Sequence, residues 1–139
     1  MKIGKKLAGI LLALCLLLSL LPMAALAAPA IPEGIWTDYA ADAFAGGSGT
    51  EEDPYQIATP EQLAKLAADV NTGVVNLSHS GEHFILTADL NLSAHRWIPI
   101  GTGTRNASFH SWYGYFDGNN KTITGLYVDE SKEEFTAGL

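Results

Sequence analysis

The clearest pattern in this chain occupies residues 84–92, which read FILTADLNL. Apolar side chains stand at every even position of this segment, and four of the five odd positions from 85 to 93 are polar. An alternation with a period of two is typical of a β-strand that buries one face. We therefore expect one dry interior, closed off by stacked neighbouring strands, to receive the even-numbered side chains Phe84, Leu86, Ala88, Leu90 and Leu92.

A helix is predicted before this strand, from Pro60 to about Asn71. Thr59 is the expected N-cap, Pro60 suits the first helical position, and Gln62 completes a capping box. Residues 71–73 read Asn-Thr-Gly, which is a helix stop signal. The apolar stripe of this helix has helical spacing and consists of Leu63, Leu66, Ala67 and Val70.

Further short extended segments are expected on both sides of this pair. Residues 117–120 read Asp-Gly-Asn-Asn and predict a tight turn, and Gly125 predicts a bulge or corner. No second helical pattern intervenes to cross between parallel strands, so the patterns favour a mainly β fold, either a sandwich or a solenoid. The expected extended segments are residues 55–58, 97–101, 113–116 and 121–128.

The N-terminus has the three parts of an export signal. Three lysines precede an apolar run over residues 7–21, and small residues follow it. Ala25-Leu26-Ala27 fits the cleavage site and makes residues 1–27 the signal peptide, with cleavage after Ala30 as the second choice. The apolar run is shorter than the roughly 20 residues of a spanning helix. Leu14, which precedes Cys15, does not fit a lipoprotein signal.

Removal of this signal leaves a strongly acidic chain. Three of the 8 basic residues lie in the signal, so 5 basic and 15 acidic residues remain, a net charge of −10. Such a charge repels phosphate backbones and argues against nucleic-acid binding. The only cysteine, Cys15, leaves with the signal, which excludes disulfides and thiol chemistry. We expect a secreted or cell-surface protein without membrane contact after signal cleavage.

Residues 28–49 are predicted as a linker-like segment, because small residues, proline and glycine dominate them. Three aromatic residues interrupt the segment, Trp36, Tyr39 and Phe44. A wholly disordered tail would be poorer in aromatics, so these are expected to pack on the domain that follows. That domain is predicted to span residues 50–139.

Four segments in a fixed order resemble bacterial surface proteins with GLUG-type repeats. The first is GSGTEEDPYQI at residues 47–57, followed by TPEQL at 59–63. The others are LTADLNL at 86–92, WIPIG at 97–101 and FDGNNKTITGL at 116–126. Each segment alone is weak evidence for the resemblance, but the four segments in this order are fairly specific for it. Together they cover most of residues 46–139.

The resemblance implies a right-handed parallel β-helix, a pectate-lyase-like solenoid, with the predicted helix as its N-terminal cap. Such segments stand at the start of large exported proteins of Gram-positive and gut bacteria, some of them adhesins and some flanking immunoglobulin-cleaving metallopeptidases. In the family, residues 137–139 would continue into further coils. A solenoid needs about three repeats and caps to be stable, so the expected solenoid is a truncated one.

The titratable residues do not predict a metal or catalytic site. His79 and His83 are four apart, but Ser80-Gly81 between them favours a loop, and the H-E-x-x-H pattern is absent. His95 and His110 lie in separate predicted loops, and exposed loop histidines are the expectation for all four. No metal and no cofactor are therefore expected.

Acidic residues and serine likewise predict structural roles. Residues 51–53 read Glu-Glu-Asp and predict a solvated turn, with calcium binding as the alternative, although the calcium-loop pattern is missing. Asp117 belongs to the predicted turn, Asp89 lies on the polar face of the strand, and no second motif makes either catalytic. Ser48 lacks the second glycine of a G-x-S-x-G motif.

Aromatic residues concentrate between positions 97 and 116, and most are expected to pack in the coil. Three of them are the candidates for stacking on sugar rings, namely Trp97, Trp112 and Tyr115. Structural roles are assigned to a larger set, which consists of Thr59, Gln62, Phe84, Leu86, Leu90, Leu92, Phe116, Gly118, Ile123 and Leu126.

The expected function is a non-catalytic extracellular or cell-surface module for adhesion or display, part of a larger surface protein. Its expected partners are glycans or host and cell-surface proteins. The alternative is an accessory N-terminal part of a carbohydrate-active enzyme or surface protease, whose catalytic residues would lie outside residues 1–139.

Overall fold

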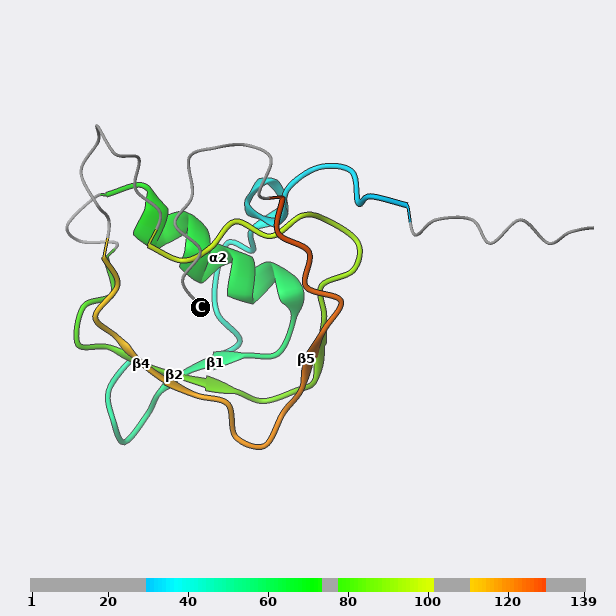
Figure 1. Cartoon of the computed structure of the whole chain (residues 1–139). Helices are drawn as coiled ribbons and strands as arrows, with labels where there is room; N and C mark the ends of the chain where they lie inside the picture. Colours follow the sequence, from blue (N-terminus) through cyan, green and yellow to red (C-terminus); the bar gives the residue numbers. More distant parts are fainter. Residues whose placement is uncertain (1–29, 74–77, 102–110, 130–139) are drawn as a thin grey trace, which may run out of the picture. The chain divides into compact units, whose positions relative to one another are not determined.

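Parallel pairing of short strands far apart in the sequence organises the chain (Figure 1). The computed structural model describes residues 30–73, 78–101 and 111–129, and from Ile31 onward these belong to one unit. Three strands form one sheet in the order β1-β2-β4, in which every pair is parallel. Their bounds are β1 Tyr55–Ile57, β2 His83–Leu86 and β4 Tyr115–Asp117.

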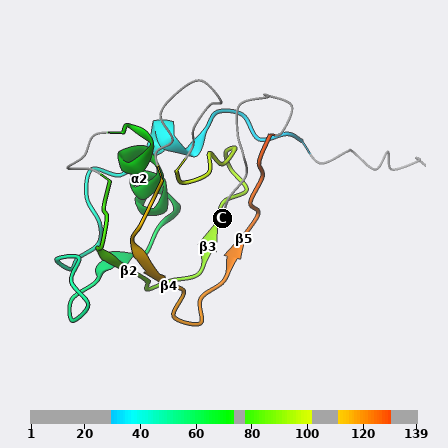
Figure 2. The same cartoon turned by 60° about the vertical axis from the view of Figure 1, so that its left-hand side comes forward.

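The register across this sheet is regular. Phe84 of β2 lies beside Tyr55 of β1, 29 positions earlier, and beside Phe116 of β4, 32 positions later. A second parallel pair joins β3 (Leu90–Asn91) to β5 (Ile123–Thr124), with Leu90 beside Ile123, 33 positions later. Figure 2 shows these two strands side by side. The chain therefore returns to the same place after about thirty residues.

Residues 84–92 differ from the expected single strand. They form two strands in two sheets, β2 and β3, separated by a corner at residues 87–89. The corner is held by partners from other segments. Thr87 donates its backbone N–H to the Ile57 carbonyl over 2.9 Å, and the Asp89 carboxylate accepts the Thr122 N–H over 2.8 Å. These contacts are not local in sequence, so the alternation could not show the corner.

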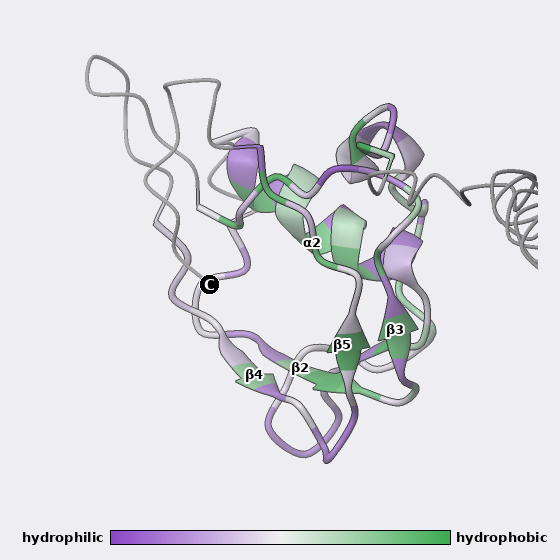
Figure 3. Cartoon of the chain, turned by 45° about the vertical axis from the view of Figure 1, so that its right-hand side comes forward, coloured by the Kyte–Doolittle hydropathy of each residue, from purple (hydrophilic) through white to green (hydrophobic). Residues whose placement is uncertain are grey.

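The buried face of this segment agrees with the prediction. Phe84, Leu86, Leu90 and Leu92 are all buried, while Ala88 at the corner is half-buried. In Figure 3, parts of β2, β3 and β5 are green, which marks hydrophobic residues. The alternation continues across the corner because both strands turn the same side of the chain inward. The buried hydrophobic core consists of Trp36, Ile57, Leu63, Ala64, Leu66, Ala67, Val70, Phe84, Leu86, Leu90, Leu92 and Trp97.

Helix α2 (Pro60–Asn71) confirms the prediction. The Thr59 hydroxyl accepts the Gln62 N–H, and Pro60 begins the helix. The Gln62 side chain reaches back to the N–H of Ala58 over 2.8 Å, one residue before the N-cap that a standard capping box uses. The Gln62 and Leu63 amides of the first turn are therefore satisfied by Thr59, and the apolar stripe of the helix is buried, with α2 in contact with β1 and η1.

The expected linker-like segment is joined to the rest of the fold over its described residues 31–49. It contains the 3₁₀ helix η1 (Trp36–Tyr39), whose Trp36 is buried in the core. The Trp36 indole N–H donates to the Leu92 carbonyl over 2.9 Å, and Ile35 bridges to Arg96. The segment packs on the strands as its aromatics predict, and it contributes to the same core.

Two expected extended segments are shorter than predicted. Residues 97–101 form no ladder, although the Trp97 N–H donates to the Tyr127 carbonyl over 2.7 Å. Residues 121–128 form a strand only over β5, because Gly125 turns the chain with a φ of 69°. A Cβ on Gly125 would lie 2.7 Å from that of Ser93, so only glycine fits this corner. The predicted signal peptide and residues 130–139 lie outside the described residues.

Candidate functional site

The strongest candidate site is the edge formed by β4 and β5, which we call the open edge. β4 pairs with β2 on one side and β5 pairs with β3 on one side, and no other described strand pairs with either. Phe84 is 1% exposed, whereas its neighbour Phe116 is 38% exposed. Leu90 is 2% exposed, whereas its neighbour Ile123 is 39% exposed. The open edge therefore carries core-type side chains that are partly in water.

The backbone of the open edge also has free hydrogen-bonding groups. The Tyr115 N–H donates to the Glu82 carbonyl, and the N–H groups of Leu90 and Leu92 donate to Thr122 and Thr124. Residues of a parallel strand direct their backbone groups alternately to the two neighbouring strands. The N–H and carbonyl groups of Phe116 and Ile123 consequently point to the side where no described strand lies.

Trp112 is a half-buried member of the same end of the fold. Its ring contacts Phe84 and Phe116 edge-on, with centroids 6.0 and 6.4 Å apart. Its indole N–H is buried and has no hydrogen-bond partner in the part of the chain that the structure describes. A buried donor without an acceptor costs about 1–3 kcal/mol. Trp112 therefore has a buried N–H without a described partner next to the open edge.

The three candidates for sugar stacking have different surroundings. Trp97 is only 8% exposed and belongs to the core, so its ring is covered and the expectation for Trp97 is wrong. Trp112 packs against the core as just described. Tyr115 is 60% exposed and stacks on His83, with ring centroids 4.4 Å apart and an interplanar angle of 19°. Tyr115 alone of these three keeps a ring largely open to a ligand.

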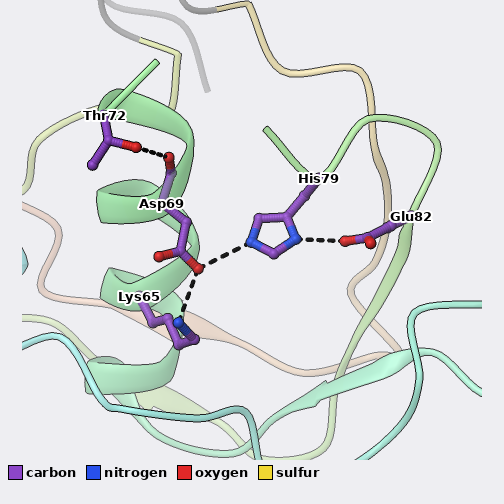
Figure 4. Close-up of polar contacts among 5 residues, drawn as sticks. All are labelled: Lys65, Asp69, Thr72, His79 and Glu82. Carbon is purple, nitrogen blue, oxygen red and sulfur yellow. Dashed lines mark hydrogen bonds and ion pairs between the residues drawn. The ribbon is translucent and has the colours of Figure 1, made fainter. Parts of the chain in front are cut away.

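A charged cluster joins helix α2 to the segment before β2 (Figure 4). Asp69 accepts from Lys65 and from Nε2 of His79, both over 3.0 Å, while Nδ1 of His79 contacts Glu82 over 2.5 Å. His79 has a φ of 50°, and its ring lies between Asp69 of the helix and Glu82. Its side chain is 10% exposed, so the expectation of an exposed loop histidine is wrong for His79.

The chemistry of this cluster favours a structural role. An ionised carboxylate can only accept hydrogen bonds, so two of them satisfy His79 when both ring nitrogens donate. The rings of Phe44, Tyr55 and Phe84 lie edge-on to the imidazole with centroids 5.3–6.1 Å away. This cluster could not be predicted from the sequence, because Asp69 and His79 are ten residues apart and meet only when the segment before β2 packs on α2.

Asp89 and Asp117 each bind a backbone N–H group. Within residues 30–73, 78–101 and 111–129, no group of three or more His, Cys, Asp or Glu side chains could hold a metal ion. Asp117 accepts the Asn119 N–H over 2.7 Å within its turn, and Asp89 holds the corner. Residues 51–53 are exposed. His110 lies outside the described residues.

No helix in the described ranges is sufficiently long and apolar to span a membrane. No family model matches the chain, and no solved structure matches it. It is 33% identical over 94 residues to a protein of Evansella cellulosilytica that is provisionally named a Gly-rich membrane protein. It is 37% identical over 90 residues to the halomucin of Haloquadratum walsbyi.

These alignments cover 63% and 61% of this chain but 9% and 1% of the two relatives. The chain thus spans a small part of the length of the curated relatives it matches. Neither name denotes an enzyme, and the two names point to the membrane or cell surface.

Proposed function

We propose that this chain supplies the first coils of an extracellular parallel β-solenoid, a non-catalytic module for adhesion or display. The observation that carries the proposal is the parallel register at intervals of 29, 32 and 33 residues. A chain that returns to the same place at such intervals stacks its own segments as rungs, which suits repeat architectures. Helix α2 and η1 cover the core beside β1, as a cap would.

Export and surface location support this role. The predicted signal peptide directs the chain out of the cytoplasm, and the acidic mature composition suits an exposed surface. The names of the two relatives, a Gly-rich membrane protein and a halomucin, agree better with a cell-surface protein than with an intracellular enzyme. Asp89 holds a corner and Asp117 a turn, while Asp69 and His79 belong to the charged cluster, which suits a scaffold.

Export is tested by expressing the full chain in a Gram-positive host with an epitope tag at its C-terminus. We expect the tag in the medium or on the cell surface, with a new N-terminus at Ala28 by N-terminal sequencing. The control lacks residues 2–27 and should stay inside the cell. An uncleaved chain in the cytosol would contradict the proposal.

Glycan binding is the adhesion chemistry we propose for this module, and it depends on Tyr115. The mature chain would be screened on an array of neutral and acidic glycans, and Tyr115→Ala should lower the affinity of a hit at least tenfold. Tyr39 gives a matched control, because it is 50% exposed and stacks on His95 with centroids 3.9 Å apart. Equal losses in Tyr39→Ala and Tyr115→Ala would contradict a specific role for Tyr115.

A further inference from the structure

We propose that the turn before β1 is a self-cleaving site, at which the side chain of Asp53 breaks the peptide bond between Asp53 and Pro54. The reaction occurs once in each chain and consumes one water molecule. It goes beyond the proposed adhesion function and does not depend on it. Asp53-Pro54 is the only Asp-Pro pair in the sequence, so cleavage gives one piece that ends at Asp53 and one that begins at Pro54.

The carbonyl group of Asp53 is held in the way that a reacting carbonyl group requires. Its oxygen accepts two backbone N–H groups, from Ser48 over 2.9 Å and from Gly49 over 3.0 Å. Two N–H groups at such distances form an oxyanion hole, which stabilises the negative oxygen that develops when a nucleophile attacks the carbonyl carbon. The turn therefore favours attack on this peptide bond.

Two glycines bring these N–H groups to the Asp53 carbonyl. Gly47 has a φ of 85° and Gly49 a φ of 81°, which glycine adopts without strain. A Cβ on Gly47 would lie 1.9 Å from the Pro54 carbonyl oxygen, so only glycine permits this close approach. Gly49 is buried, and its carbonyl accepts the N–H of His83 over 2.9 Å. The N–H of Gly49 is consequently held in a fixed position, shielded from water.

The nucleophile is the side-chain carboxyl group of Asp53 itself. Asp53 is exposed, and none of the described residues forms a hydrogen bond or an ion pair with this carboxyl group. One of its oxygens can attack the carbonyl carbon of the same residue and close a small ring, a cyclic anhydride. Because nucleophile and carbonyl group belong to one residue, bringing them together costs little entropy.

The leaving group is the backbone nitrogen of Pro54, which belongs to a tertiary amide and carries no hydrogen. As the carboxyl oxygen bonds to the carbonyl carbon, the bond from that carbon to nitrogen breaks. The proton of the carboxyl group passes to the nitrogen, which leaves as a secondary amine. Water then opens the anhydride, and attack on either of its carbonyl groups gives the same C-terminal aspartic acid. No oxidant or reductant takes part.

Cleavage should accelerate as the pH falls, because the carboxyl group must carry the proton that it delivers to the nitrogen. The titratable groups that face the turn are Glu51 and Glu52 on the turn itself, and Tyr55 and His83 from β1 and β2, which contact Gly49. Glu52 gives a matched control, since it is an exposed carboxyl group of the same turn that is not attached to the reacting residue.

The two pieces remain joined after cleavage. The N–H of Ala45 donates to the Gln56 carbonyl over 2.9 Å, and the N–H of Gln56 donates to the Gly46 carbonyl over 2.8 Å. Trp36 is buried in the core, on the other side of the cleaved bond in the sequence. Cleavage therefore has to be measured under denaturing conditions.

The test follows the mature chain by mass spectrometry in neutral and mildly acidic buffers with protease inhibitors. We expect a piece with Pro54 as its N-terminus, formed at a rate that does not depend on protein concentration. The same chain in concentrated urea lacks the two N–H donors and should cleave roughly a hundredfold more slowly, a typical cost of losing an oxyanion hole. An intact folded chain, or equal rates with and without urea, would overturn the proposal.

Three variants identify the reacting groups, with circular dichroism to verify that each one is folded. Asp53→Ala should abolish cleavage, because the nucleophile is lost. Pro54→Ala should slow it about tenfold, because the leaving nitrogen is less basic. Glu52→Gln should leave the rate unchanged. Cleavage that persists in Asp53→Ala or is lost in Glu52→Gln would show that Asp53 is not the nucleophile, and an unchanged rate in Pro54→Ala would contradict the proposed leaving group.

Discussion

Phe84 and Phe116 are the same residue type, lie side by side across β2 and β4, and differ sharply in burial. Phe84 has a paired strand on both sides, and the rings of Phe44, Tyr55 and His79 contact it from the end covered by α2. Phe116 has a described strand on one side only. Burial in this fold is therefore set by the place of a residue in the stack as much as by its type.

The largest expected effect tests this contrast directly. Phe84→Ala should lower the free energy of unfolding by about 3–5 kcal/mol, as for other large-to-small changes in a core. Phe116→Ala should cost about 1 kcal/mol or less, because part of its ring is already in water. Urea unfolding of the mature chain measures both. Similar losses at the two positions would mean that the two ends are packed alike.

Gly47, close to β1, and Gly118, in the turn after β4, allow a second comparison of the two ends of the sheet. Gly47 has a φ of 85°, and a Cβ there would lie 1.9 Å from the Pro54 carbonyl oxygen, so Gly47→Ala should cost about 1–3 kcal/mol. Gly118, in the turn after β4, has nothing within 4 Å of an added Cβ, and Gly118→Ala should change stability by less than about 0.5 kcal/mol. Thermal unfolding by circular dichroism compares them, and a larger loss at Gly118 would reverse the contrast.

The charged cluster is expected to contribute a smaller share to the covered end. Asp69→Asn and His79→Gln should each lower the free energy of unfolding by about 1–2 kcal/mol, because hydrogen bonds to partly buried charged groups are lost. The double variant should show a coupling above about 0.5 kcal/mol. Glu51→Gln in the exposed turn is the control and should be neutral. Additive effects of the two changes on the free energy of unfolding would show that Asp69 and His79 are not energetically coupled.

The smallest expected effect concerns the start of α2. Thr59→Ala should cost about 1 kcal/mol, because the hydroxyl that accepts the Gln62 N–H is lost. Thr59→Ser should restore most of that stability, since serine caps equally well. Amide exchange at Gln62 measures the local effect. Failure of serine to restore protection would show that the methyl group of Thr59, and not its hydroxyl, matters.

Local patterns predicted the parts of this fold that local forces govern. The capped helix, its stop at Gly73 and the turn after Asp117 follow from side-chain hydrogen bonds and backbone preferences over a few residues. The alternation in residues 84–92 gave the buried face correctly, because burial of every second side chain does not depend on which strand lies alongside.

The missed features all depend on partners distant in sequence. The corner at residues 87–89 needs the Ile57 carbonyl and the Thr122 amide, and the charged cluster needs α2 to meet the segment before β2. Trp97 belongs to a segment rich in aromatic residues, and only its place in the packed core shows that it is buried. The individual residues of the candidate site were not predictable, since the exposure of Phe116 depends on which described strands pair with β4.

The sequence by itself determined which faces of its segments are apolar, where its helix begins and ends, and how acidic the chain is after residue 27. The tertiary structure alone decided which strands pair, where the ladder stops, and which apolar side chains remain in water. The physical reason is that side-chain periodicity is a property of a few neighbouring residues. Strand pairing joins residues about thirty positions apart, and its register depends on packing across the whole fold.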